Sequence, residues 1–155
     1  TQKAIDELLK EKDDFGIHGF LIIDMDHFKD VNDIYGHIMG DKVLKMFGGF
    51  LKEQFREQDV IGRIGGDEFV VLLYNIGSRE NMESRIEDLC KKIRKLHMEG
   101  MGEHQFTASM GIAFAPQDGD TFMELYQKAD MALYQTKKSG RDGYRIYQQV
   151  HAKTT

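Results

Sequence analysis

Cysteine and long apolar runs are scarce in this sequence, and its 21 Lys and Arg residues are outnumbered by 26 Asp and Glu residues. The single Cys90 excludes an internal disulfide, fits a reducing cytoplasm and, because it lies in an apolar helical pattern, is interpreted as a core residue. No apolar run approaches the length of a membrane span, and no signal-peptide pattern opens the chain. The net charge of −5 argues against nonspecific binding of nucleic acid, so a phosphorylated ligand would need local cations.

The composition of the chain is that of one globular domain. Its 155 residues are 41% hydrophobic and 30% charged, which is long and apolar enough for a sizeable core. The first helical pattern begins without a cap or a preceding element. We therefore expect residues 1–155 to be a single domain that has been excised from a longer protein.

A glycine pair followed by two acidic residues stands at the centre of the sequence. Gly65-Gly66-Asp67-Glu68-Phe69 separates two β-branched, apolar runs at 59–64 and 70–74, which predicts a β-hairpin. Asp67 and Glu68 then lie at the hairpin tip and point to opposite faces, so one could bind a metal while the other has a separate role. The glycines allow positive φ and close approach of a ligand. The plainer alternative is a solvated turn.

The other elements complete an α+β pattern. The periodicities predict the following elements: helix 4–12, strand 19–24, one or two helical turns in 27–33, helix 39–55, helix 81–96, strand 106–114, a helix opened by a capping box at Thr121–Glu124 and ended at Ser139-Gly140, and strand 144–147. This order predicts a ferredoxin-like β-α-β-β-α-β core with an extra C-terminal helix and strand.

That arrangement would place the first strand beside the second strand of the hairpin. Asp24, which ends the first strand, would then come close to Asp67 and Glu68. Three converging carboxylates suggest a divalent-metal site, and hard oxygen ligands favour Mg²⁺ or Mn²⁺ over zinc. The six histidines show no zinc-ligand spacing.

An ordered set of motifs resembles a known family over nearly the whole chain. The motifs are 24–33 (DMDHFKDVND), Gly36-His37, Gly40-Asp41, 63–69 (RIGGDEF), 109–111 (SMG), 129–134 (ADMALY) and 137–141 (KKSGR). Together they are similar to the GGDEF domain of bacterial diguanylate cyclases, whose fold resembles the palm of nucleotide cyclases. One departure is the absence of the Asp-x-Leu-Thr-x-Leu stretch that often precedes the family's first helix.

The resemblance implies a metal site and a catalytic group at the hairpin. Asp24 and Asp67 match Mg²⁺ ligands, and the carbonyl of Met25 completes that set. Glu68 matches a further metal or catalytic group, and either Asp67 or Glu68 could take the proton. Gly65 and Gly66 belong to the substrate-binding turn.

The resemblance also implies a nucleotide site. Asn32 and Asp41 match guanine readers, because a carboxylate can accept from N1–H and the 2-amino group of guanine while an amide both donates and accepts. His37 borders that pocket. For Asp41 the alternative is a helix cap.

Three basic residues match a triphosphate clamp. Lys29, Lys137 and Arg141 supply the local positive charge that the chain otherwise lacks. For Lys137 and its neighbour Lys138 the alternative is a solvated cationic helix end, which the helix dipole also favours.

Arg56 and Asp59 match the family's RxxD motif for inhibition by product. Arginine can stack on guanine and bind phosphate. The alternative is a polar connection from helix to strand.

The reaction that the resemblance implies joins two GTP molecules into cyclic di-GMP and releases two pyrophosphates. One domain binds one GTP, so two GGDEF domains must face each other as a homodimer, and the expected location is the cytoplasm. A second hypothesis is an inactive module that binds GTP or cyclic di-GMP. A third is another metal-dependent cyclase or palm-type nucleotidyl transferase.

Overall fold

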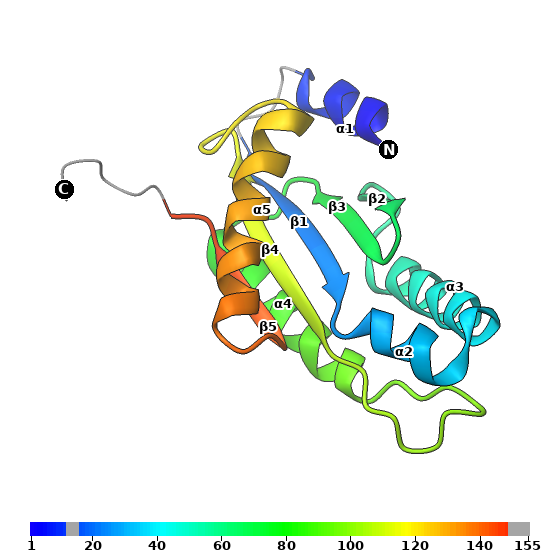
Figure 1. Ribbon diagram of the computed structural model, residues 1–155. Coiled ribbons are helices and arrows are strands. Elements are labelled where there is room, and N and C mark those ends of the chain that lie inside the picture. Colours follow the sequence, from blue (N-terminus) through cyan, green and yellow to red (C-terminus); the bar gives the residue numbers. More distant parts are fainter. Residues whose placement is uncertain (12–15, 149–155) are drawn as a thin grey trace.

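A five-stranded sheet with helices on both faces forms the molecule (Figure 1). The structure is a computed structural model that describes residues 1–11 and 16–148. In chain order the elements are α1 (Gln2–Leu9), β1 (His18–Met25), α2 (Phe28–Tyr35), α3 (His37–Gln54), β2 (Val60–Gly65), β3 (Glu68–Leu73), α4 (Arg79–Arg94), β4 (Ala108–Ala115), α5 (Phe122–Lys138) and β5 (Gly143–Ile146).

The strand order confirms the predicted ferredoxin-like core. The sheet runs β2-β3-β1-β4-β5, with β1 antiparallel to both β3 and β4 and with β5 added in parallel to β4. The hairpin's second strand is therefore the neighbour of β1, and Asp24 pairs directly with Glu68 across that ladder. The end of β1 and the hairpin turn meet as the element order predicts.

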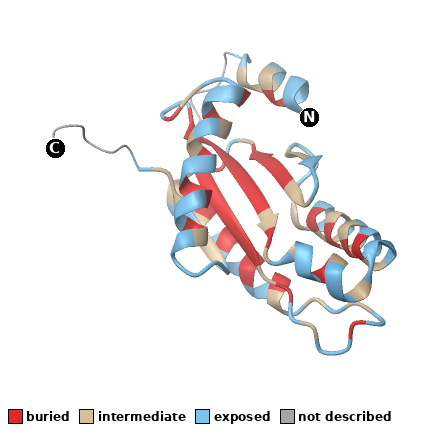
Figure 2. Cartoon of the chain, viewed as in Figure 1, coloured by how far each residue is buried: buried red, intermediate tan, exposed pale blue. Residues whose placement is uncertain are grey.

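The alternation of side chains along β1 divides the core into two layers. Phe20 and Ile22 face α1 and α5, whereas Leu21 and Ile23 face the layer that contains α3 and α4. Figure 2 shows the three central strands, β1, β3 and β4, buried over most of their length, whereas the edge strands β2 and β5 contain no buried residue. β1 is thus covered on both faces, which explains why its sequence is continuously apolar.

Helix boundaries differ from the sequence prediction mainly between α2 and α3. Gly36 has a φ of 91°, which ends α2 and lets α3 begin at once at His37, two positions before the predicted start. Asp41 consequently lies inside α3, so the alternative that it caps this helix is wrong. The predicted end of the first helix, Lys12, and the C-terminal tail from residue 149 lie outside the described residues.

α5 is held closely against β4. A Cβ atom added to Gly111 would lie 2.1 Å from the carbonyl oxygen of Ala129, so only glycine permits this approach. One residue earlier on β4, the carbonyl of Met110 accepts from the hydroxyl of Thr136 at 2.8 Å. The last turn of α5 is therefore fixed beside the end of β1.

The start of α5 confirms one half of the capping box. The Thr121 hydroxyl accepts from the backbone N–H of Glu124 at 3.2 Å. The Glu124 carboxylate accepts from the N–H of Asp120 instead of the N–H of Thr121.

Cys90 is a core residue, as its sequence context predicts. Its side chain belongs to the layer under α4, and burial raises the pKa of the thiol to about 11. A thiol with that pKa is almost entirely protonated at neutral pH, which argues against a nucleophilic role.

Among the described helices, none combines the length and the apolar character that a membrane span requires.

Candidate active site

The hairpin turn presents Asp67 between β2 and β3. Gly66 has a φ of 51°, and its carbonyl accepts a hydrogen bond from the guanidinium of Arg63 at 2.8 Å. The pairing of the two strands shifts between Arg63 and Gly65, which marks an irregularity just before the turn. The position of Asp67 is thus fixed by the positive φ of Gly66 and by the hydrogen bond from Arg63 across the turn.

Asp67 and Asp24 lie side by side at the end of the sheet. Burial and the neighbouring Asp24 carboxylate raise the pKa of Asp67 to about 6. One oxygen of Asp24, Oδ2, accepts from the ammonium of Lys137 at 2.5 Å. The other, Oδ1, is buried and has no hydrogen-bond partner. Two adjacent carboxylates with an unpartnered buried oxygen favour a shared proton or a bound cation.

Glu68, which pairs with Asp24 across the β1–β3 ladder, has a hydrogen-bond partner of its own. Its Oε1 accepts a hydrogen bond from the hydroxyl of Tyr126 on α5 at 2.6 Å. The described residues contain no group of three or more His, Cys, Asp or Glu side chains arranged to hold a metal. The sequence predicted that three carboxylates converge; the structure brings Asp24 and Asp67 together and gives Glu68 a different partner.

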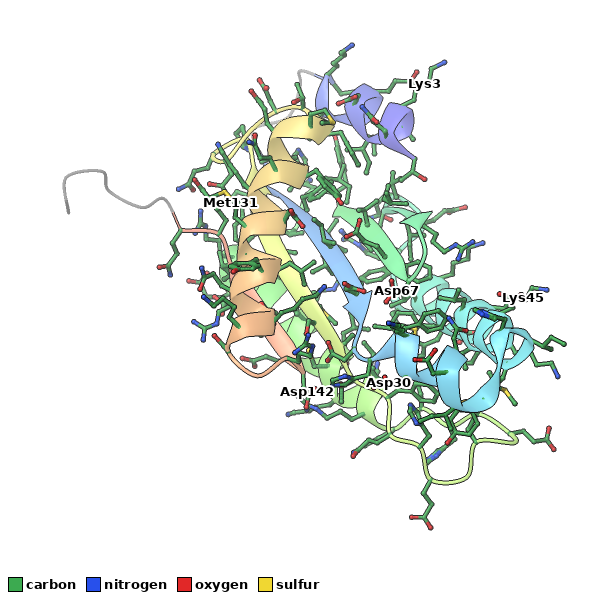
Figure 3. The ribbon with its side chains drawn as sticks, viewed as in Figure 1. Lys3, Asp30, Lys45, Asp67, Met131 and Asp142 are labelled. Atoms are coloured by element: carbon green, nitrogen blue, oxygen red, sulfur yellow. The ribbon has the colours of Figure 1, made fainter. Side chains whose placement is uncertain are left out.

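The predicted phosphate-binding residues surround the same cavity as the aspartate pair. Lys29 of α2, Lys137 of α5 and Arg141 beyond α5 line a cavity of about 290 Å³. The full lining, which we call the Asp24 cavity, is Asp24, Met25, Asp26, His27, Phe28, Lys29, Asp30, Asp67, Lys137 and Arg141. In Figure 3, Asp67 is labelled at the hairpin, Asp30 on α2 and Asp142 at the foot of α5, around the region where these elements meet.

The predicted guanine readers lie on α2 and α3, which pack closely. A Cβ added to Gly40 would lie 1.9 Å from Oδ1 of Asn32, so the Asn32 amide rests on the backbone just before Asp41. His37, the first residue of α3, is exposed. The structure thus brings Asn32 near Asp41 and places His37 at the exposed start of the helix that carries Asp41.

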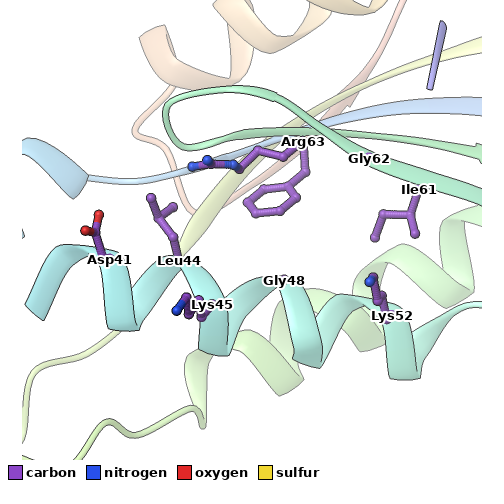
Figure 4. Close-up of a pocket in the computed structure, with 9 residues that line it drawn as sticks. Asp41, Leu44, Lys45, Gly48, Lys52, Ile61, Gly62 and Arg63 are labelled. Atoms are coloured by element: carbon purple, nitrogen blue, oxygen red, sulfur yellow. The ribbon is translucent and has the colours of Figure 1, made fainter. Parts of the chain in front are cut away.

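Asp41 opens onto a second cavity, which lies between α3 and the hairpin (Figure 4). This cavity of about 610 Å³ combines apolar walls with three basic residues, and we call it the Arg63 cavity. Its lining is Asp41, Leu44, Lys45, Gly48, Lys52, Ile61, Gly62, Arg63 and Phe69. Asp41 and Arg63 place the Arg63 cavity beside the hairpin turn that carries Asp67.

Arg56 and Asp59 form a closed network before β2. The Asp59 side chain is fully buried, and its carboxylate accepts from the backbone N–H groups of Arg56 at 2.9 Å and Tyr74 at 3.0 Å. The Arg56 guanidinium donates to the carbonyl of Tyr74 at 2.7 Å, and Arg85 of α4 lies 3.8 Å from Asp59. Asp59 thus has a clear structural role, whereas both arginines keep part of their surface exposed.

Two residues of the site were not predicted from the sequence. Tyr126 fits the apolar stripe of α5 and was interpreted only as a core residue, although its hydroxyl holds Glu68. Asp26 belongs to the quoted motif but received no role, although its carboxylate accepts three hydrogen bonds. For Tyr126, the available signal in the sequence was a hydroxyl at the edge of an apolar stripe. For Asp26, it was the position of a second aspartate two residues after Asp24.

Comparisons with known proteins identify the family. The model of the family described as "Diguanylate cyclase, GGDEF domain" matches residues 1–143. The chain belongs to the GGDEF-domain family. It is 38% identical over 149 residues to the bifunctional diguanylate cyclase/cyclic di-GMP phosphodiesterase MucR of Pseudomonas aeruginosa, covering 95% of this chain and 21% of that protein.

Two further similarities support this assignment. The chain is 37% identical over 133 residues to the diguanylate cyclase DgcS of Shewanella oneidensis, covering 84% of this chain and 43% of that protein. The crystal structure of the GGDEF domain of YfiN (TpbB) from Pseudomonas aeruginosa matches with a TM-score of 0.83 and 29% identity, covering 96% of this chain and 91% of that one. The chain therefore spans less than half the length of MucR or DgcS but nearly all of an isolated GGDEF domain.

Proposed function

We propose that this GGDEF domain is a diguanylate cyclase that condenses two GTP molecules into cyclic di-GMP and releases two pyrophosphates. The observation that carries the proposal is the aspartate pair at the Asp24 cavity. Asp24 and Asp67 lie together, Oδ1 of Asp24 is buried without a partner, and three cationic side chains line the same cavity. Negative and positive groups arranged in this way suit a metal-bound triphosphate.

The residues present fit Mg²⁺ or Mn²⁺. Both aspartates offer hard oxygen ligands, and Met25, which lines the same cavity, offers a backbone carbonyl. A bound ion would lower the pKa of a ribose 3′-hydroxyl and stabilise charge that develops on the α-phosphate. Glu68 is a further ligand or a catalytic group, and we propose that Asp67 or Glu68 takes the proton of the 3′-hydroxyl.

The cationic side chains bind and orient the phosphates. Lys29 comes from α2, whereas Lys137 and Arg141 come from the end of α5 and the turn after it, so the three can contact a triphosphate from more than one side. Lys137 neutralises Asp24 in the present structure. A divalent cation held by Asp24 would neutralise that carboxylate in its place, and the Lys137 ammonium would then be available to a phosphate oxygen.

The base is read by groups on α2 and α3. Asn32 and Asp41 offer the acceptors and donors that guanine requires and that adenine does not match, and His37 borders them. The close packing of Asn32 on Gly40 keeps the amide beside the helix that carries Asp41. These contacts predict selectivity for GTP over ATP.

A second GGDEF domain completes the reaction. Each domain presents one nucleotide, so two copies must face each other for the two 3′-hydroxyls to reach the two α-phosphates. We propose that the product also binds at Arg56 and Asp59 as an inhibitor, with the exposed part of the Arg56 guanidinium as the contact. The reaction belongs to the cytoplasm, where GTP is available.

The proposal is tested by incubating the protein with GTP and Mg²⁺ and separating the products by chromatography. Because catalysis requires two domains, the assay is run on the chain alone and on the chain fused to a dimeric coiled coil. We expect cyclic di-GMP from the fused form, and we expect Glu68→Ala to abolish it. The absence of cyclic di-GMP from the forced dimer would contradict the proposal, as would faster turnover of ATP than of GTP.

One observation favours a second candidate function. The Lys137 ammonium occupies Oδ2 of Asp24, so the structure as it stands holds no free pair of carboxylates. A domain fixed in this form would bind GTP or cyclic di-GMP and regulate a neighbouring module without turnover. Calorimetry that shows stoichiometric GTP binding by the forced dimer, together with no product, would establish this alternative.

A further inference from the structure

Asp26, which follows β1, is the hub of a hydrogen-bond network beside the Asp24 cavity. Its Oδ2 accepts from the Thr107 hydroxyl at 2.7 Å and from the backbone N–H of Asp142 at 3.0 Å. Its Oδ1 accepts from the Ser109 hydroxyl at 2.6 Å. One carboxylate therefore joins the end of β1, the start of β4 and the turn that follows α5.

The turn that follows α5 has a costly backbone conformation. Gly140, Arg141 and Asp142 have φ values of 113°, 64° and 49°, and the last two are not glycine. Consecutive non-glycine residues at positive φ are strained and persist only where the surrounding contacts determine them. The strain therefore needs an explanation in the contacts that hold this turn.

Arg141 and Asp142 make three contacts that hold the turn in place. The Arg141 N–H donates to the carbonyl of Thr136 at 3.0 Å, and the next N–H, that of Asp142, donates to Asp26. The carboxylate of Asp142 accepts from Nε of Arg94 at 2.9 Å, which fastens the turn to the last turn of α4. Figure 3 shows Asp142 at the foot of α5.

We propose that Asp26 is a positioning residue for nucleotide phosphates that acts through Arg141. By holding the N–H of Asp142, the Asp26 carboxylate keeps the left-handed turn that directs Arg141 to the Asp24 cavity. The inference rests on the proposed function, because it assumes that the phosphates of a nucleotide enter this cavity.

Charge alone cannot explain an aspartate at this place. Asp26 itself lines the cavity, so its negative charge repels an entering phosphate. A carboxylate can accept all three converging hydrogen bonds, whereas the NH2 group of an asparagine in the same place would require a hydroxyl to accept instead of donate. Loss of Asp26 therefore has opposite expected effects: tighter phosphate binding if only its charge matters, and weaker binding if it positions Arg141.

The test compares a nucleotide that has phosphates with one that has none. The affinities of 3′-deoxy-GTP and 3′-deoxyguanosine, which cannot react because they lack the 3′-hydroxyl, are measured by calorimetry with Mg²⁺. We expect Asp26→Ala to weaken the binding of 3′-deoxy-GTP about tenfold and to leave the affinity for 3′-deoxyguanosine within about twofold. A merely destabilised fold would weaken the binding of both compounds.

Asp30→Ala is the matched control. Asp30 lines the same cavity and is exposed, with only a weak 3.8 Å contact to His27. Its removal deletes one negative charge and no anchor of the turn, so the affinity for 3′-deoxy-GTP should stay equal or increase. A loss equal to that of Asp26→Ala would show that any carboxylate of this cavity matters and would overturn the inference.

Two further variants separate positioning from direct contact. In an Arg141→Ala background, Asp26→Ala should add less than about a twofold loss, because both changes remove the same interaction. The double variant Thr107→Val, Ser109→Ala keeps the charge of Asp26 but removes two hydrogen bonds to its carboxylate. It should therefore weaken 3′-deoxy-GTP binding, as Asp26→Ala does. This double variant replaces Asp26→Ala in the test if Asp26→Ala does not fold.

Several results would overturn the inference. One is unchanged or tighter binding of 3′-deoxy-GTP by Asp26→Ala. Another is an equal loss of affinity for 3′-deoxyguanosine and 3′-deoxy-GTP. A third is full additivity of the losses caused by Asp26→Ala and Arg141→Ala. If the unmodified protein binds no 3′-deoxy-GTP, the proposed function itself fails, and this result is distinguishable because it needs no variant.

Discussion

Two aspartates of this domain, Asp59 and Asp24, lie near basic side chains but differ in how their oxygens are used. Asp59 is fully buried, and both oxygens accept hydrogen bonds from the backbone or from Arg56. Asp24 has one oxygen on Lys137, one buried oxygen without a partner, and the Asp67 carboxylate beside it. Asp24 lies near the end of β1 and Asp59 lies just before β2, yet only Asp59 has a hydrogen-bond partner for each of its two carboxylate oxygens.

The difference shows how a structural carboxylate can be told from one that is kept for a ligand. Buried polar atoms in folded proteins are almost always paired, so an orphaned oxygen next to a second carboxylate needs an explanation. A cation that binds both groups supplies one. The network of Asp59 needs no ligand to be stable, even if a product binds to the exposed arginines nearby.

The largest effect should come from removing half of the unsatisfied pair. Asp67→Asn should lower cyclic di-GMP formation by the forced dimer about a thousandfold, because it removes a proposed ligand of the metal. The melting temperature without divalent cations should not fall, since the mutation also removes the repulsion from Asp24. Product formation is followed by chromatography and melting by circular dichroism with and without a chelator. Retained activity, or a large loss of stability without metal, would show that Asp67 has a structural role like that of Asp59.

The opposite result is expected for the satisfied aspartate. Asp59→Ala should lower the free energy of unfolding by about 3 kcal/mol, because two backbone N–H groups and two guanidiniums lose a buried acceptor. Urea denaturation measures the change. Asp88→Ala, which removes an exposed ion pair with Lys92, is the control and should change stability by less than about 0.5 kcal/mol. Equal effects of the two variants would refute the structural role of Asp59.

A smaller effect should separate the base-reading end of the site from the metal end. Gly40→Ala places a Cβ against Oδ1 of Asn32 and should lower the preference for GTP over ATP about tenfold without removing any metal ligand. Gly49→Ala is the control on the same helix, because no atom lies within 4 Å of the added Cβ. It should keep the preference and slightly raise stability. An unchanged preference in Gly40→Ala would argue against Asn32 as a guanine reader.

The smallest effect concerns Glu68, whose carboxylate accepts one hydrogen bond, from the hydroxyl of Tyr126. Glu68 is thus intermediate between the fully hydrogen-bonded Asp59 and Asp24, which has an unpartnered oxygen. Tyr126→Phe should raise the Mg²⁺ concentration for half-maximal activity about threefold, because Glu68 loses one hydrogen bond. Tyr134, an exposed tyrosine on the same helix, supplies the matched change to phenylalanine, which should leave the Mg²⁺ dependence as it is. If both variants behave alike, the bond from Tyr126 has no part in the reaction.

The sequence predicted the parts of this site that follow from element order. The hairpin, the neighbouring strands β1 and β3, and the approach of Asp24 to Asp67 all follow from a β-α-β-β-α-β pattern with acidic residues at two strand ends. The resemblance to the GGDEF family supplied the basic residues, and the structure brings Lys29, Lys137 and Arg141 to one cavity.

The rest depends on contacts between residues far apart in the sequence. The hydroxyl of Tyr126 reaches Glu68 over 58 residues, and the N–H of Asp142 reaches Asp26 over 116. Periodicity assigns a side chain to a face, but it cannot say which polar atom on that face finds a partner. The same limit explains the helix boundary at His37, where the positive φ of Gly36 joins two helices that the pattern separated.

The central claim is that Asp24 and Asp67 hold one divalent cation on the phosphates of a nucleotide. The most direct measurement is the anomalous scattering of manganese in crystals grown with Mn²⁺ and 3′-deoxy-GTP. The account predicts a manganese peak within bonding distance of both carboxylates and of a phosphate oxygen, with the Lys137 ammonium moved off Asp24. A bound nucleotide with no manganese between Asp24 and Asp67 would contradict it.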